Sequence, residues 1–166
     1  MRHAISILVD NQAGVLSRVV GLFSGRGFNI ESLSVAPTLD PTKSKMVITT
    51  TGNEQVLEQI KKQLNKIVNV IKVVDFMGKD YVEREMILIK VKARDESRAE
   101  VLRIADIFRA KVVDVSQNSY TLALTGDQEK LKAFIDLLSP VGIIDFIRTG
   151  TIVMEREMQA KRRTEQ

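Results

Sequence analysis

Nine residues near the N-terminus have the types and spacing of a small-ligand site: Asp10-Asn11-Gln12-Ala13-Gly14-Val15-Leu16-Ser17-Arg18. They join an apolar run to a helical pattern, and a helix start leaves N–H groups without partners and carries partial positive charge, which suits a carboxylate. Gly14 lets backbone amides approach a ligand closely, and Asn11 offers a donor and an acceptor. The stretch therefore indicates either a pocket for the carboxylate and amine of a free amino acid or a plain helix start with an Asx-type turn.

The elements that position this turn follow from hydrophobic spacing. Residues 4–9 are rich in β-branched side chains, and apolar residues between 15 and 23 recur at helical spacing. The chain then continues as strand, strand, helix and strand near 28–37, 43–52, 53–65 and 69–76. This order predicts the split βαβ, ferredoxin-like arrangement, with both helices on one face of an antiparallel four-stranded sheet.

The same order of elements starts again after Gly78-Lys79-Asp80, with strands near 85–93, 111–116, 119–125 and 143–147 and two intervening helices. We therefore predict an α+β fold of two tandem ferredoxin-like βαββαβ domains, with antiparallel sheets and helices on one face. The predicted domains are residues 1–78 and 79–153, followed by a tail at 154–166. The second half has Arg94-Asp95-Glu96-Ser97-Arg98 in place of the first turn and lacks its glycine. We assign the ligand to the first half and a structural or docking role to the second.

Composition narrows the classes of partner. The net charge of +4 is spread out, with nine basic against six acidic residues in 1–78 and sixteen against fifteen in 79–166. RNA-recognition modules share this strand order but stack bases on aromatic side chains of their two central strands, and the matching strands of the first half, near 4–9 and 43–52, carry none. No apolar run approaches the ~20 residues that span a bilayer, and zero cysteines fit a reducing compartment. We expect a cytoplasmic protein that binds neither nucleic acid nor membrane.

Residues for catalysis or metal binding are not arranged in any known pattern. His3 is the sole histidine and stands at the start of a strand, and no cysteine is available as a metal ligand. The serines lack a base placed by a motif, and neither a phosphate-binding Walker motif nor a G-x-G-x-x-G pattern occurs. We therefore expect no catalytic residue, no metal site and no cofactor in this chain.

Two consecutive stretches resemble a known family: Asn11-Gln12-Ala13-Gly14-Val15-Leu16-Ser17-Arg18-Val19 and Gly21-Leu22-Phe23-Ser24-Gly25-Arg26-Gly27-Phe28-Asn29-Ile30-Glu31-Ser32-Leu33-Ser34-Val35-Ala36-Pro37. They closely resemble the regulatory (small) subunit of acetolactate synthase, also called acetohydroxyacid synthase. The resemblance begins in what looks like an ACT domain, the amino-acid-sensing ferredoxin-like module, and extends to about residue 155.

The resemblance implies a non-catalytic subunit that binds and activates a thiamine-diphosphate-dependent catalytic (large) subunit in valine, leucine and isoleucine biosynthesis. It implies feedback inhibition by a branched-chain amino acid, usually valine, and places thiamine diphosphate, FAD and magnesium on the catalytic subunit. ACT domains in this family pair as a homodimer, with each effector between one chain's first turn and the other chain's second strand. Carried onto this sequence, the effector-binding residues are Asn11, Gly14, Val15 and Leu16, with Asn29 and Ile30 entering from the partner.

Two other functions stay open on the residues alone. One is a free-standing ACT-type amino-acid sensor that regulates another enzyme or a transcription factor, although no helix-turn-helix segment is visible. The other is an enzyme, which the missing catalytic constellation disfavours. The preferred branched-chain amino acid, the oligomer size and the surface that meets the catalytic subunit do not follow from the sequence.

Overall fold

The computed structural model describes residues 1–157, and the chain divides into two compact units, which we describe separately. The first unit comprises Met1–Val82 and, of the described residues, 153–157, and the second comprises Glu83–Ile152. These limits differ by a few residues from the boundaries expected at 78/79 and 153/154. The first unit contains β1 (Arg2–Asp10), α1 (Val15–Gly25), β2 (Ile30–Pro37), β3 (Lys43–Thr51), α2 (Glu54–Leu64) and β4 (Val70–Asp75).

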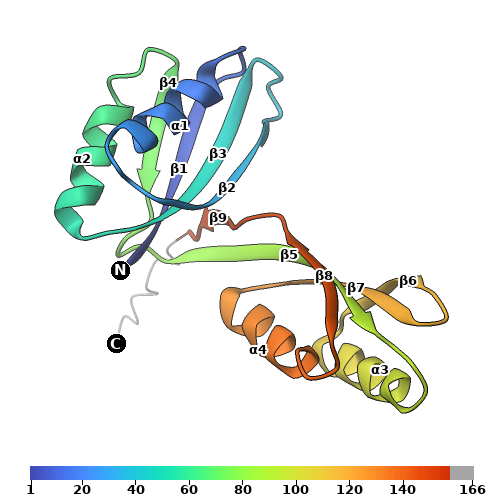
Figure 1. Ribbon diagram of the computed structural model, residues 1–166. Helices are drawn as coiled ribbons and strands as arrows, with labels where there is room; N and C mark the ends of the chain where they lie inside the picture. Colours follow the sequence, from blue (N-terminus) through green and yellow to red (C-terminus); the bar gives the residue numbers. More distant parts are fainter. Residues whose placement is uncertain (158–166) are drawn as a thin grey trace, which may run out of the picture. The chain divides into compact units, whose positions relative to one another are not determined.

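The first sheet is antiparallel and runs in the order β2-β3-β1-β4, so the strand that leads into the turn is a central one. Both helices lie on one face of this sheet (Figure 1). Side chains alternate between the faces of a strand, and Ile5, Ile7 and Val9 of β1 are at most 1% exposed because they point to the helices. Phe23 of α1 and Ile60 of α2 are fully buried in the same core. The predicted ferredoxin-like fold is confirmed for this half.

Helix α1 has its end fixed by local sequence. The amide of Phe28 donates to the Phe23 carbonyl at 2.9 Å, and the amide of Gly27 donates to the Ser24 carbonyl at 3.2 Å. Gly27 has φ +70°, a left-handed conformation that favours glycine. This pair of bonds is the Schellman motif, which satisfies the last carbonyls of a helix. Helix α1 therefore ends at Gly25, and Gly27 provides the left-handed residue just beyond it.

The second unit repeats the topology with β5 (Tyr81–Lys92), α3 (Glu96–Phe108), β6 (Lys111–Val115), β7 (Ser119–Gly126), α4 (Gln128–Leu138) and β8 (Ile143–Arg148). Its sheet order is β6-β7-β5-β8, again antiparallel, and α3 and α4 lie on one face (Figure 1). Ile87, Ile89, Leu122 and Phe134 are fully buried in its core. Among residues 1–157 no helix is both long and apolar enough to cross a membrane.

A short strand follows that the sequence analysis did not predict, β9 (Ile152–Glu155), which pairs with β5. Val153 is 7% exposed and packs with Ala4, Val47 and Phe76. Ala4 alternates with the helix-facing residues of β1, so this small cluster lies on the sheet face opposite the helices. The segment expected as a tail therefore begins inside β9, and residues 158–166 lie outside the described part of the chain.

Candidate effector-binding site

The turn between β1 and α1 is open to solvent and needs a glycine. Gly14 is the N-cap of α1 with φ +86° and ψ −12°, a left-handed conformation that is unfavourable for residues with a β-carbon. A β-carbon built at Gly14 would meet no atom within 4 Å, and Asn11 to Gly14 are all exposed. The backbone conformation therefore requires glycine, while the space above the turn is free for another molecule.

The first amides of α1 supply unused donors beside this space. Within residues 1–157, no protein acceptor hydrogen-bonds to the amides of Leu16 or Ser17, and the Val15 amide makes only a 3.4 Å contact with the Gln12 carbonyl. Regular helical bonding begins with the Arg18 amide, which donates to the Gly14 carbonyl at 3.1 Å. Unsatisfied donors at a helix start, together with the helix dipole, favour an anion such as a carboxylate.

Asn11 connects the turn to the loop between β2 and β3. Its side-chain Nδ2 donates to the Pro41 carbonyl at 2.9 Å, and its backbone amide donates to the Thr42 carbonyl at 2.8 Å. The acceptor Oδ1 of Asn11 makes no hydrogen bond within the described residues. Asn11 is therefore placed to accept a hydrogen bond from a ligand while its donor side holds the neighbouring loop.

That loop is itself ordered by short-range bonds. The carboxylate of Asp40 accepts from the Thr42 amide at 3.0 Å and from the Thr42 hydroxyl at 2.6 Å. These two bonds lower the pKa of Asp40 below its ordinary value because they favour the charged form. The Thr38 amide also donates to the Lys43 carbonyl at 2.8 Å. Asn11 thus contacts a structured loop, which gives the turn a physical connection to β2 and β3.

Of the other expected site residues, Val15 and Leu16 differ in what they can offer. The Val15 side chain is 3% exposed and packs in the core, so only its N–H can face a ligand. Leu16 is 40% exposed and can offer both its amide and its apolar side chain. Their assignment to an effector stays a prediction, with the backbone as the larger contributor at Val15.

Asn29 and Ile30 lie at the far end of the same sheet. Ile30 pairs with Thr50, which also pairs with His3, whereas Asp10 at the other end of β1 pairs with Lys43. One chain therefore does not bring these two residues to its own turn. A site that contains both groups needs a second chain.

A polar brace beside the turn was not predicted from the sequence. Asn69, which precedes β4, donates from Nδ2 to the Asp10 carboxylate at 3.2 Å and accepts from the Arg18 guanidinium at 2.6 Å. Its carbonyl also accepts from the Asp10 amide at 3.0 Å. The only hint in the sequence was a polar residue just before a strand, which is too common to indicate a contact across 59 residues.

The equivalent turn in the second unit is held by a side chain of its own helix. The Arg98 guanidinium donates to the carbonyls of Ala93, at 3.0 Å, and Gln117. Asp95, the N-cap of α3, has φ +48°. The assignment of the ligand to the first half stays a prediction, and the structure adds a second difference between the turns: the second has a guanidinium bonded to two of its carbonyls, besides lacking the glycine.

Comparison with known proteins decides the family. Residues 5–72 match the model of the AHAS small subunit-like ACT domain, and residues 84–157 match that of the small subunit of acetolactate synthase. Over 157 residues the chain is 51% identical to the acetolactate synthase small subunit of Haemophilus influenzae, which covers 94% of this chain and 96% of that protein. The chain belongs to the acetolactate synthase small-subunit family.

Other members of the small-subunit family agree in sequence and in structure. The acetolactate synthase isozyme 3 small subunit of Escherichia coli is 48% identical over 94% of this chain and 96% of its own length. The crystal structure of the acetolactate synthase small subunit from Thermotoga maritima superposes with a TM-score of 0.87 at 40% identity, over 95% of this chain and 98% of that one. The resemblance stated from the sequence is confirmed, as is the tandem α+β fold.

Membership of the small-subunit family also indicates the role of the chain. These proteins are regulatory subunits, and the first unit is an ACT domain rather than a catalytic fold. Across residues 1–157, no group of three or more histidine, cysteine, aspartate or glutamate side chains is placed to hold a metal ion. The function of this small subunit therefore depends on what it binds.

Proposed function

We propose that this chain is the regulatory subunit of an acetolactate synthase, that it activates the thiamine-diphosphate-dependent catalytic subunit, and that it confers feedback inhibition by a branched-chain amino acid, with valine as the first candidate. The observation that carries the proposal is the exposed β1–α1 turn, where Gly14 in a left-handed conformation leaves open space beside unused helix amides. Thiamine diphosphate, FAD and magnesium belong in this proposal to the catalytic subunit. Free amino acid, a second copy of the chain and the catalytic subunit are its partners, and neither nucleic acid nor membrane is among them.

The effector's polar end matches the groups around the turn. Its carboxylate would accept from the amides of Leu16 and Ser17, which have no protein acceptor within the described residues, and its ammonium would donate to Asn11 Oδ1. Charge-assisted bonds of this kind are stronger than neutral ones. An aliphatic side chain buried in the same site contributes about 1.5–3 kcal/mol.

A homodimer completes the site in this proposal. Strand β2 is an edge strand of the first sheet, so one side of its backbone is free to pair with another chain. Because Asn29 and Ile30 lie at the end of the sheet away from Asn11, they reach an effector only on the turn of a second copy. An effector held by two chains stabilises their pairing, and a change in pairing is transmitted to the catalytic subunit as a coupling free energy of ~1–3 kcal/mol.

We place this assembly in the cytoplasm, which suits a chain of 166 residues without cysteine. Calorimetric titration of the full chain with valine, leucine and isoleucine tests the effector class. Saturable binding that Asn11→Ala weakens supports the turn as the site. Absence of binding, both to the chain alone and to its complex with a catalytic subunit, contradicts the proposal.

A mixing experiment tests the dimer geometry. A dimer of two Asn11→Ala chains has one altered residue in each effector site, and so has a dimer of two Asn29→Ala chains. In a mixed dimer, both substitutions fall in one site and the other site is intact. Random mixing makes about half of the dimers mixed, so about one site in four is restored. If mixing restores no binding while each variant still dimerises, the two residues do not belong to one site shared between chains.

A further inference from the structure

The second unit contains a hollow that none of the functions above uses. It lies between β5, β8 and the first turns of α4, with a volume of about 320 Å³, and its lining includes Glu85, Gln128, Leu131, Lys132, Ile135 and Arg148. This volume is at the lower end of the roughly 300–1,000 Å³ range of small-molecule sites. The hollow is therefore large enough for a metabolite of few atoms.

A buried carboxylate, of which one oxygen accepts no hydrogen bond, is part of the lining of this hollow. The Glu85 side chain is 2% exposed, and its Oε2 accepts from Gln128 Nε2 at 2.9 Å. Its Oε1 is buried and forms an ion pair with Arg148, whose Nε lies 3.6 Å away, but it accepts no hydrogen bond within the described residues. Buried acceptors without donors are unfavourable and rare, so Oε1 is a natural attachment point for a ligand that brings its own N–H.

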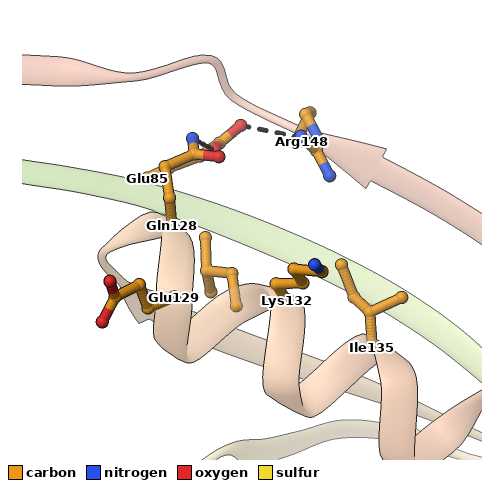
Figure 2. A pocket seen from close by; sticks show the side chains of 7 residues that line it. Glu85, Gln128, Glu129, Lys132, Ile135 and Arg148 are labelled. Atoms are coloured by element: carbon orange, nitrogen blue, oxygen red, sulfur yellow. Dashed lines mark hydrogen bonds and ion pairs between the residues drawn. The ribbon is translucent and has the colours of Figure 1, made fainter.

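The other lining groups define what else that ligand carries. Lys132 and Arg148 place two positive charges at the exposed rim, where the Arg148 side chain is 47% exposed. Leu131 is buried and Ile135 is half-buried, so α4 also offers an apolar wall. Figure 2 shows Arg148 across from Glu85, with Lys132 and Ile135 following along α4 and Glu129 pointing away. One acidic, one basic and one apolar surface thus meet in a single small space.

We propose that this hollow is a second binding site, for a small aliphatic α-amino acid. The ligand's ammonium takes the place of the Arg148 side chain, 47% exposed, beside Glu85 Oε1, its carboxylate then lies against Lys132 and Arg148, and its side chain contacts Ile135. A buried carboxylate is best matched by a charged donor, and the two rim cations match the ligand's own carboxylate. The proposal concerns the other unit of the chain and does not depend on the effector turn, although the sequence assigned this half only a structural or docking role.

Methyl NMR of the full chain, labelled at isoleucine, leucine and valine, separates the two sites. Methyl signals of Leu131 and Ile135 report on the hollow. Those of Leu16, and of Ile30 from the second copy, report on the proposed effector site at the turn. The probes are L-valine and 3-methylbutanoate, which is valine without its ammonium group. We expect valine to shift the hollow's methyl signals in a saturable way and 3-methylbutanoate to leave them unchanged.

Substitutions then test the contact itself. Glu85→Gln keeps the shape and the bond to Gln128 but removes the charge, and it should weaken valine binding in the hollow by at least about tenfold. Asp136→Asn removes a carboxylate from the exposed side of α4 and should leave binding unchanged. Unshifted core methyl signals of Leu122 show that each variant remains folded.

The outcomes for the two sites are distinct. If valine at up to about 10 mM, ten times a weak millimolar Kd, shifts the turn signals alone, the hollow is not an amino-acid site and the inference fails while the proposed function stands. If only the hollow responds, the proposed effector turn fails instead. Equal binding of 3-methylbutanoate, or equal affinity in Glu85→Gln, overturns the assignment of the ammonium to Glu85.

Discussion

Gly14→Asp compared with Gly14→Asn isolates the charge of the proposed effector. The two side chains have nearly the same shape, and a β-carbon at Gly14 meets no atom within 4 Å, so neither clashes with the protein. Only aspartate places a negative charge where the effector's carboxylate is proposed to lie. At about 4 Å, two like charges repel by ~1 kcal/mol in water and by ~4 kcal/mol at the effective dielectric typical of a protein surface. We therefore expect Gly14→Asp to bind valine between about fivefold and a thousandfold more weakly than Gly14→Asn.

The stability of these two variants should not follow their affinity. Gly14 has φ +86°, and placing a residue with a β-carbon there costs about 1 kcal/mol, although asparagine and aspartate tolerate this conformation best. The melting temperature of a unit of this size then falls by roughly 4–8 °C. Aspartate beside the start of α1 regains ~0.3–1 kcal/mol from the helix dipole, so Gly14→Asp should be at least as stable as Gly14→Asn.

Calorimetric titration with valine and thermal unfolding followed by circular dichroism measure the two effects on the same samples. The informative result is a variant that is the more stable of the pair and yet the weaker binder. If Gly14→Asp and Gly14→Asn bind valine with the same affinity, no anion lies near Gly14, and the assignment of the carboxylate to the first amides of α1 is wrong.

Three further predictions concern the loop and the second core. Asn11→Ala removes the 2.9 Å bond to Pro41 and should speed amide exchange in residues 38–43 while costing at most about 1 kcal/mol of stability; unchanged exchange in mass spectrometry contradicts this role. The pKa of Asp40 is lowered in the folded chain, so its bonds stabilise the loop above the unfolded pKa and are lost as the pH falls through the folded pKa; NMR of the Thr42 amide should follow this acid transition, and Asp40→Asn should abolish it. Phe134→Ala should destabilise the second unit by about 3–5 kcal/mol in urea denaturation because the side chain is fully buried, and a loss below 1 kcal/mol would show that the core relaxes into the cavity.

Most of the fold could be predicted because strong periodicity marks each element. The β-branched run at residues 4–9 lies in the strand Arg2–Asp10, and the helix expected near 53–65 is Glu54–Leu64. Alternating burial in the strand and a 3.6-residue spacing of apolar residues in the helix each mark a buried face. Strand β9 was missed because Ile152–Glu155 is only four residues long and its pairing with β5 is not local. Short strands held by distant partners leave little trace in their own sequence.

The candidate site was likewise predicted only in part. The glycine and the helix start were visible in the sequence because a strand, a turn and a helix follow one another directly. The bond from Asn11 to Pro41 was not, because it joins residues 30 positions apart through a loop whose path depends on the pairing of β2 and β3. Asn29 and Ile30 entered the prediction only through the family resemblance, since one chain keeps them away from its own turn.

The two units show why a shared topology does not give a shared site. In the first, Gly14 turns the backbone and leaves open space above it. In the second, Arg98 holds the corresponding turn by donating to the carbonyls of Ala93 and Gln117. Removing Arg98 would leave these two carbonyls without their guanidinium donor. The N-cap would still be Asp95, a residue with a β-carbon at a positive φ. A single substitution therefore cannot convert the second turn into a copy of the first. The ligand that we propose for the second unit therefore binds elsewhere, beside α4, where Glu85 Oε1 accepts no hydrogen bond from the protein.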